Sequence, residues 1–255
     1  MKVAIFGAGT MGSGIAQVFA AKGHTALMYA SSVASAQKHK DKLAASLAKR
    51  VAKGKMTQEA VDALLANILV EEKSACADAD LIIECVKEDM ATKKELLNEL
   101  DALCKPEAIF ASNTSSISLT ALASATKRPS RVVGMHFFSP VPKMKLCEVI
   151  FGLLTEQDVL DSIKAVGERM GKTLILADDK PGFIVNRALL PMLNEACVIV
   201  GSYIGSVEDM DNGMKLGCNH PMGPLELADM IGLDILLNVM NVLSKEYGEK
   251  YHPSL

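Results

Sequence analysis

The chain has 255 residues, of which 49% are hydrophobic and 22% are charged, and its formal net charge is −3. This composition is typical of a soluble globular protein with one large or two modest domains, and the charge argues against a generally basic nucleic-acid binder. Because no apolar run is long enough to span a bilayer and the sequence opens on a strand-like run without a signal peptide, we expect a cytoplasmic protein that binds no membrane.

Strand-like and helix-like segments alternate from the start of the chain. The predicted strands lie near 2–6, 25–29, 81–84, 108–111 and 131–136. The predicted helices lie near 10–23, 33–54, 57–66 and 91–104. Continuous apolar strands separated by helices are typical of a parallel sheet covered on both faces. The predicted fold class is therefore α/β, with an N-terminal, doubly wound, mostly parallel Rossmann sheet.

After residue 183 the pattern changes to helices with wide apolar faces. The segment 178–183, which contains a proline and a glycine, is the natural joint. We predict a dinucleotide-binding domain over 1–182 and a smaller all-helical domain over 183–255 that binds substrate. Its apolar faces exceed what it can bury within itself, which favours a homodimer formed through this domain.

Gly7, Gly9 and Gly12 form the pattern G-x-G-x-x-G between the first predicted strand and the first predicted helix. Such a loop gives a tight turn, a close approach of backbone to a pyrophosphate, and N–H groups at a helix N-terminus. We predict a nicotinamide dinucleotide site here, with Thr10 and Met11 among its contacts. A purely structural glycine turn is the alternative.

The second predicted strand is followed by Ala30, where this dinucleotide-binding pattern usually has an acid that holds the ribose hydroxyl. Ser31 and Ser32 come next, and Lys38 lies within reach in sequence. Because no carboxylate would repel a 2′-phosphate, the sequence favours acceptance of NADP(H). Looser binding of NAD(H) through other contacts is the alternative.

A basic segment, 38–55, holds seven lysines or arginines against one acid. Ser46, Lys49, Arg50 and Lys53 fall at helical spacing within it, so that one side could hold a polyphosphate. The segment lacks the interleaved aromatic residues that stack on nucleic-acid bases. We therefore expect an anionic substrate tail here and no nucleic acid, with a solvated charged helix face as the alternative.

Polar residues follow two neighbouring predicted strands. Asn113 and Ser115 lie in "ASNTSS", beyond the fourth strand, and His136 closes the fifth. Ligands of open α/β sheets bind outside the carboxyl ends of strands. Glu148 lies in an apolar segment, where an unpaired carboxylate is costly and an imidazole is a suitable partner. We predict a His136–Glu148 pair, against the alternative of a core histidine with a satisfied hydrogen bond.

Five motifs together resemble one enzyme family over essentially the whole chain. They are "GAGTMGSGIAQ", "ASNTSS", "GMHFFSPVPKMKLCEVI", "PGFIVNR" and "MKLGCNHPMGPLELAD". In order and spacing they resemble the L-3-hydroxyacyl-CoA dehydrogenase family, and within it the bacterial 3-hydroxybutyryl-CoA dehydrogenase type. The resemblance implies hydride transfer between NAD(P)(H) and a short-chain (S)-3-hydroxyacyl-CoA, with acetoacetyl-CoA and (S)-3-hydroxybutyryl-CoA as the expected pair, in a homodimer that needs no metal.

The resemblance also implies roles for single residues. The implied catalytic residues are His136, Glu148, Ser115 and Asn186. The implied cofactor contacts are Glu88 and Lys93, to which we add Asn113 and Ser115 from their place at the sheet edge. The implied CoA contacts are Ser46 and Lys53, which gives the basic segment a purpose.

Two departures from the family stand beside this resemblance. The ribose-binding acid is replaced by Ala30, and the chain stops at "YHPSL" where family members continue for a further helical segment, so we expect a truncated C-terminus. A dehydrogenase for a small free β-hydroxyacid is one rival interpretation, although such an enzyme would be expected to carry a catalytic lysine in its helical domain. A non-catalytic nicotinamide-binding relative is the other.

Overall fold

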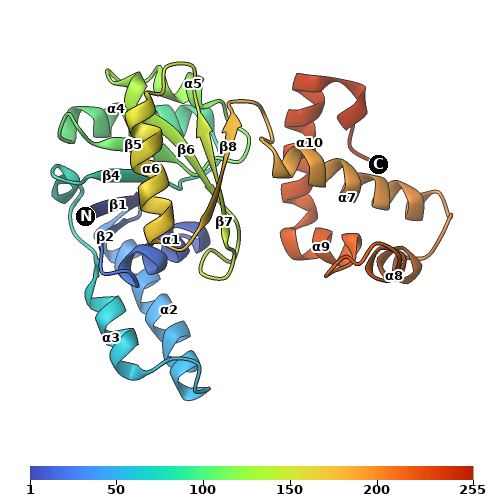
Figure 1. The fold of residues 1–255 in the computed structure, drawn as a ribbon, viewed down its shortest axis with the longest axis horizontal. Coiled ribbons are helices and arrows are strands. Elements are labelled where there is room, and N and C mark those ends of the chain that lie inside the picture. The colour runs from blue at the N-terminus through green and yellow to red at the C-terminus, as the bar shows by residue number, and fades with distance from the viewer. Residues whose placement is uncertain (255) are drawn as a thin grey trace. The chain divides into compact units, whose positions relative to one another are not determined.

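The computed structural model describes residues 1–254. The chain forms two compact units, Met1–Asp179 and Lys180–Leu255. Strands and helices alternate along the first unit, whereas the described residues of the second contain helices and no strand (Figure 1). The predicted α/β part followed by an all-helical part is confirmed.

One eight-stranded sheet is the frame of the first unit. The strands are β1 (Lys2–Phe6), β2 (Thr25–Tyr29), β3 (Ile68–Leu69), β4 (Leu81–Glu84), β5 (Ile109–Ser112), β6 (Val132–Phe137), β7 (Leu146–Phe151) and β8 (Thr173–Asp178). Their order is β3-β2-β1-β4-β5-β6-β7-β8, and all neighbours are parallel except β6 and β7. The mostly parallel, doubly wound sheet is as predicted. The strands β3, β7 and β8 are not among the predicted ones.

Helices connect these strands and begin at recognisable caps. They are α1 (Thr10–Ala20), α2 (Val33–Ala52), α3 (Gln58–Ala66), α4 (Met90–Leu103), α5 (Leu119–Ala123) and α6 (Gln157–Arg169), with 3-10 segments η1 (Lys73–Cys76) and η2 (Pro129–Arg131). Ser32, Thr57, Asp89 and Ser118 each accept the N–H three residues on, as N-caps do. The predicted start after Thr57 is confirmed, and the long basic helix α2 ends two residues before the predicted Gly54. In Figure 1, α2 and α3 extend beyond the sheet as a pair.

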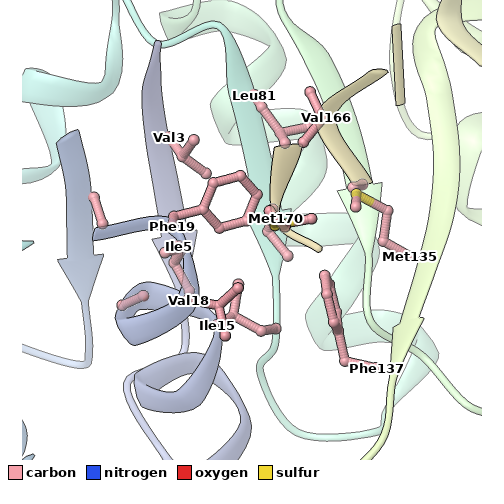
Figure 2. Close-up of a cluster of buried hydrophobic side chains, with 14 of the residues drawn as sticks. Val3, Ile5, Ile15, Val18, Phe19, Leu81, Met135, Phe137, Val166 and Met170 are labelled. Atoms are coloured by element: carbon pink, nitrogen blue, oxygen red, sulfur yellow. The ribbon is translucent and has the colours of Figure 1, made fainter. Parts of the chain in front are cut away.

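The larger core lies against one face of the sheet. Figure 2 shows Phe19 of α1 and Val166 of α6 in one cluster with Ile5 of β1 and Met135 of β6. These side chains are buried, with Phe19, Ile5 and Met135 each 0% exposed. Right-handed crossovers place α4 and α5 on the opposite face. With both faces covered, the strand ends are the part of the sheet that remains available for ligands.

The second unit is built from four α-helices and one 3-10 segment among its described residues. They are α7 (Val185–Gly201), α8 (Val207–Gly217), α9 (Pro224–Ile231), α10 (Leu233–Tyr247) and η3 (Glu249–Tyr251). Its core gathers Leu190 and Leu193 of α7 with Leu236 and Leu243 of α10. Asp211 of α8 accepts the N–H groups of two residues in the first turn of α9, so it caps a neighbouring helix.

Across residues 1–254, no single helix is long and apolar enough to cross a membrane. The pair α9 and α10, bent by 96°, meets that criterion together by length and composition alone.

Candidate active site

Parallel strands bring the predicted functional groups to one edge of the sheet. The register pairs Phe6 with Glu84, Glu84 with Ser112, and Ser112 with Gly134. The glycine loop therefore leaves β1 beside the end of β4, the polar segment 113–116 leaves β5, and the end of β6 follows. The strand order reverses between β1 and β4, and ligands of doubly wound sheets bind at such a reversal.

The glycine loop leaves open backbone where a pyrophosphate would approach. A Cβ added at Gly7, whose φ is +107°, would lie 2.4 Å from the carbonyl oxygen of Cys85, and one at Gly12 would lie 1.8 Å from that of Gly7. These two glycines are required by close packing. At Gly9 an added Cβ would meet nothing within 4 Å. Helix α1 begins at Thr10, and within residues 1–254 no side chain caps its start. The loop and helix start fit a dinucleotide phosphate.

The end of β2 is where a dinucleotide's adenosine ribose would be held. Tyr29 closes this strand with its ring stacked on Phe6, at a centroid separation of 4.4 Å. Ala30 follows, half-buried, and Ser31 is exposed. The hydroxyl of Ser32 accepts the N–H of Ser35 at 3.1 Å and so caps α2. This turn holds hydroxyl groups and no acid.

The carboxylate of Glu88 organises the segment that carries Ser115. Its Oε1 accepts the N–H of Ser115 at 2.9 Å and of Ser116 at 3.2 Å, and the hydroxyl of Thr114 at 2.5 Å. Burial would raise the pKa of Glu88, but the charge of Lys93 and these hydrogen bonds outweigh it and hold the pKa below its ordinary value. One ionised carboxylate thus fixes three consecutive residues.

Lys93 of α4 lies in the interior behind Glu88. Its side chain is 1% exposed, and Nζ lies 2.7 Å from Oε1 of Glu84 and 3.2 Å from Oε2 of Glu88. Glu84 is 0% exposed and also accepts the hydroxyl of Ser112 and the N–H of Val86, both at 2.6 Å. Lys93 therefore lies behind Glu88, and its predicted contact with a cofactor stays a prediction. Glu84 is not among the predicted residues, although an acid that closes the apolar strand "LIIE" is a usable signal.

His136 and Glu148 face each other across the antiparallel pair β6–β7. They are cross-strand partners, and Nδ1 of His136 lies 2.7 Å from Oε2 of Glu148. Glu148 is 0% exposed and the histidine side chain 8% exposed. An ionised carboxylate can only accept, so Nδ1 carries the proton in this contact. The ring of Phe138 lies 4.6 Å from the imidazole, centroid to centroid.

Asn113 connects the Ser115 segment to the strand of His136. Its Oδ1 accepts the N–H of Phe137 at 2.9 Å, and its own N–H donates to the carbonyl oxygen of Glu84 at 2.8 Å. The ends of β4, β5 and β6 are thereby joined by hydrogen bonds. The structure brings Ser115, Asn113 and His136 onto one connected frame, as their positions in the sequence predict.

The remaining predicted residues lie on helices. Asn186 is half-buried in the first turn of α7, in the second unit. Ser46, Lys49, Arg50 and Lys53 are exposed at or just after the C-terminal half of α2, at a spacing that puts them on one side. Their roles stay predictions. Within residues 1–254, no group of three or more His, Cys, Asp or Glu side chains is arranged to hold a metal ion.

Comparison with known proteins gives one consistent result along the whole chain. A family model described as 3-hydroxyacyl-CoA dehydrogenase, NAD binding domain, matches residues 2–180, and that of the C-terminal domain matches 182–255. The 3-hydroxybutyryl-CoA dehydrogenase of Clostridioides difficile is 46% identical over 259 residues, covering 100% of this chain and 92% of that protein.

Solved structures agree with the sequence comparison. The (S)-3-hydroxybutyryl-CoA dehydrogenase PaaH1 from Ralstonia eutropha is 45% identical with a TM-score of 0.94. FadB2 from M. tuberculosis is 37% identical with a TM-score of 0.96. Each match covers 99% of this chain and 90% of the other.

The open space at Gly9 gives a test of the phosphate site. Gly9→Ala is expected to fold as well as the wild type, because its φ of −63° suits any residue and the new methyl group meets no atom. We expect it to weaken NADH binding by about tenfold or more, roughly 1.4 kcal/mol, because the methyl group occupies the surface that the pyrophosphate must approach. Fluorescence titration with NADH and thermal unfolding measure the two effects.

Gly213→Ala, an exposed change within α8, is the matched control and should alter neither NADH binding nor folding appreciably. Gly12→Ala should impair both, since its Cβ has no room. Wild-type affinity in Gly9→Ala would show that the loop is not the pyrophosphate site.

Proposed function

The chain belongs to the 3-hydroxyacyl-CoA dehydrogenase family, and from that premise we propose that it transfers hydride reversibly between a nicotinamide dinucleotide and a short-chain (S)-3-hydroxyacyl-CoA. Acetoacetyl-CoA and (S)-3-hydroxybutyryl-CoA are the proposed pair, because relatives at 44–46% identity are named 3-hydroxybutyryl-CoA dehydrogenase or probable 3-hydroxybutyryl-CoA dehydrogenase. The observation that carries the proposal is the buried His136–Glu148 pair at the ligand-binding edge of the sheet.

The proton chemistry falls to His136. A bound nicotinamide supplies or accepts the hydride at its C4. In the reductive direction, Nε2 of protonated His136 donates a proton to the oxygen on C3 of the substrate, and in the oxidative direction it takes that proton back. Glu148 contacts Nδ1, fixes the tautomer and balances the charge of the imidazolium.

The developing charge on the substrate oxygen needs donors that are already in place. Ser115 is proposed to supply one with its hydroxyl, because the hydrogen bonds from its backbone and neighbours to Glu88 hold it in position. Asn186 is assigned the same role on the family resemblance. Donors of this kind stabilise an oxyanion without reorganising during the reaction.

The exposed cationic side of α2 is the proposed contact for CoA. Lys49, Arg50 and Lys53 place three positive charges within about one turn, with Ser46 one turn earlier. Charge-assisted hydrogen bonds from lysine and arginine are the usual means of binding phosphate.

The second unit is the proposed dimer surface. Large apolar side chains are exposed along its helices in the single chain. They include Ile204, Leu216, Met230, Leu233 and Ile235, each at least half exposed. Exposed apolar surface on this scale marks a protein interface, and a second copy of the chain is the proposed partner.

NADPH is proposed to serve as well as NADH. The turn after β2 carries Ala30 and the exposed Ser31 in place of an acid, so nothing there repels a 2′-phosphate. The nicotinamide chemistry is the same for both dinucleotides, and only the ribose contact differs.

The decisive test is oxidation of NADH and NADPH by the purified protein with acetoacetyl-CoA, with free acetoacetate as the comparison. We expect turnover with the thioester and far weaker turnover with the free acid, because only the thioester offers phosphates to α2. Equal activity on both would favour the free β-hydroxyacid dehydrogenase. Absence of turnover with either would favour the non-catalytic relative.

The His136→Gln variant tests the proton carrier. Glutamine cannot carry the proton, so kcat should fall by about 100-fold or more while NADH affinity stays nearly unchanged. Steady-state kinetics and NADH titration measure these. His252→Gln, at an exposed histidine, is the control and should behave as the wild type. A loss in kcat of less than about fivefold would remove His136 from the proposed role.

The Ala30→Asp variant tests the ribose contact. A carboxylate at this position should lower kcat/KM for NADPH by about tenfold or more through repulsion of the 2′-phosphate, with NADH affected little. Ala30→Asn, equal in size and neutral, separates charge from bulk. If the wild type already rejects NADPH, the proposal for this turn is wrong.

A further inference from the structure

Three charged side chains at the edge of the sheet form a buried chain of acid, cation and acid, which we call the buried triad: Glu84, Lys93 and Glu88. Lys93 Nζ contacts both carboxylates, at 2.7 Å and 3.2 Å. Glu84 and Lys93 are buried, with exposed fractions of 0% and 1%, whereas the Glu88 side chain is 38% exposed. The triad therefore runs from the interior at the end of β4 out to the ligand-binding edge.

Burying the inner pair is not an efficient way to gain stability. Two charges removed from water lose hydration that their attraction only partly restores, and well-packed apolar residues often stabilise a core as much. The pair is tolerated because its groups are satisfied: Glu84 accepts from Lys93, from the hydroxyl of Ser112 and from the N–H of Val86. A costly arrangement at the edge of a site suggests a purpose beyond stability.

Helix α4 has attachments besides the triad. Asp89 caps the first turn of the helix by accepting the N–H of Thr92. Near its other end, Asp101 contacts Nε of Arg128 at 2.6 Å and also accepts the N–H of Lys127. The C-terminal end of α4 is therefore held by groups that do not include the inner pair.

The triad instead ends on the segment that carries Ser115. Glu88 Oε1 receives the N–H groups of Ser115 and Ser116, while Glu88 Oε2 faces Lys93. One oxygen of the carboxylate is thus held by the interior of the protein and the other holds the segment. A shift of Lys93 would be transmitted to Ser115 through a single rigid carboxylate.

We infer that Glu84 and Lys93 are positioning residues for the reaction proposed above: they fix the carboxylate of Glu88, which in turn fixes the backbone at residues 115 and 116 and so the Ser115 hydroxyl. This inference rests on the proposed function for its catalytic consequence. The positional consequence stands on the contacts alone.

The charges around Glu88 determine how the arrangement responds to pH. Lys93 faces it from α4, Glu84 lies beyond Lys93 on β4, and hydroxyl and N–H groups of residues 114–116 face it from the segment after β5. With Lys93 in place, the pKa of Glu88 is held below its ordinary value, which favours the ionised carboxylate that accepts these hydrogen bonds. Without that cation, burial is the larger effect and its pKa should rise.

The test is the double variant Glu84→Gln with Lys93→Met. Lys93→Met alone would leave the Glu84 carboxylate buried and unpaired, which is strongly destabilising. The double variant removes both charges of the inner pair together, and its glutamine oxygen can still accept the N–H of Val86. The matched control is Lys73→Met with Glu99→Gln, which neutralises an exposed ion pair between η1 and the same helix α4, with side chains 44% and 52% exposed.

We expect kcat with acetoacetyl-CoA to fall by about tenfold or more in the double variant. The acid limb of the kcat–pH profile should move to higher pH, because Glu88 then protonates sooner. Hydrogen–deuterium exchange at the amides of residues 115 and 116 should be about tenfold faster or more. The control should match the wild type in all three measurements.

Unchanged kcat and unchanged exchange at 115 and 116 would overturn the inference. So would faster exchange spread evenly over α4 and β4, because that is the signature of a structural role alone. If the double variant does not fold, Glu84→Gln alone, which leaves Lys93 paired with Glu88 but removes the carboxylate that holds it from the interior, should still accelerate exchange at 115 and 116 by about threefold, and no acceleration there would overturn the inference.

These readouts separate two kinds of failure. If the wild type does not turn over acetoacetyl-CoA, the proposed function fails, and the exchange data alone decide whether Glu84 and Lys93 position the segment. If the wild type is active and exchange is unaltered in the variant, the inference fails and the proposed function stands.

Discussion

The parallel hydrogen-bonded register of β1, β4, β5 and β6 is the constraint on which the rest of this protein depends. Parallel strands put all their carboxyl ends on one side, so whatever follows each strand meets at the same edge. The glycine loop, the Glu88 turn, the Ser115 segment and His136 arrive there from four separate stretches of sequence. Helices on both faces make the sheet rigid, so the segments that leave the strand ends start from fixed positions.

Three carboxylates organise this edge of the sheet, and each has a different set of partners. Glu84 is balanced by a lysine, Glu88 by a lysine and by backbone N–H groups, and Glu148 by an imidazole. The partner sets what the acid can do. An acid bound to backbone fixes a loop, whereas an acid bound to a histidine prepares a group that can exchange protons.

Most of the alternating elements could be predicted because periodicity and capping are local. Thr57 starts α3 as its residue type indicates, and the apolar runs of β1, β4 and β5 are unmistakable. The strands β7 and β8 were harder to predict. Glu148 interrupts the apolar run of the first. The second, β8, lies at the sheet edge, where five of its six residues are intermediate in burial or exposed and one alanine is buried.

Within the site, a contact is harder to predict from the sequence when more elements must come together to form it. The His136–Glu148 contact could be predicted, because a buried acid near a histidine demands a partner. The buried triad could not, because Glu84 meets Lys93 and Ser112 only once β4, α4 and β5 are packed. Lysine in the first turn of a helix is ordinarily solvated, and nothing local reveals that Lys93 points inward.

The cross-strand pairing of His136 with Glu148 makes the proton-transfer pair an all-or-none property of the chain. Along β7, neighbouring side chains alternate between faces, so sliding that strand by one position would put Cys147 or Val149 opposite the imidazole. Such a slip would turn the side chains of β7 to the opposite face and remove the acid from its place beside the imidazole. The pair is therefore either aligned or absent. A sheet with β7 in the wrong register would lack the carboxylate partner of His136 and could not carry out the proposed proton transfer.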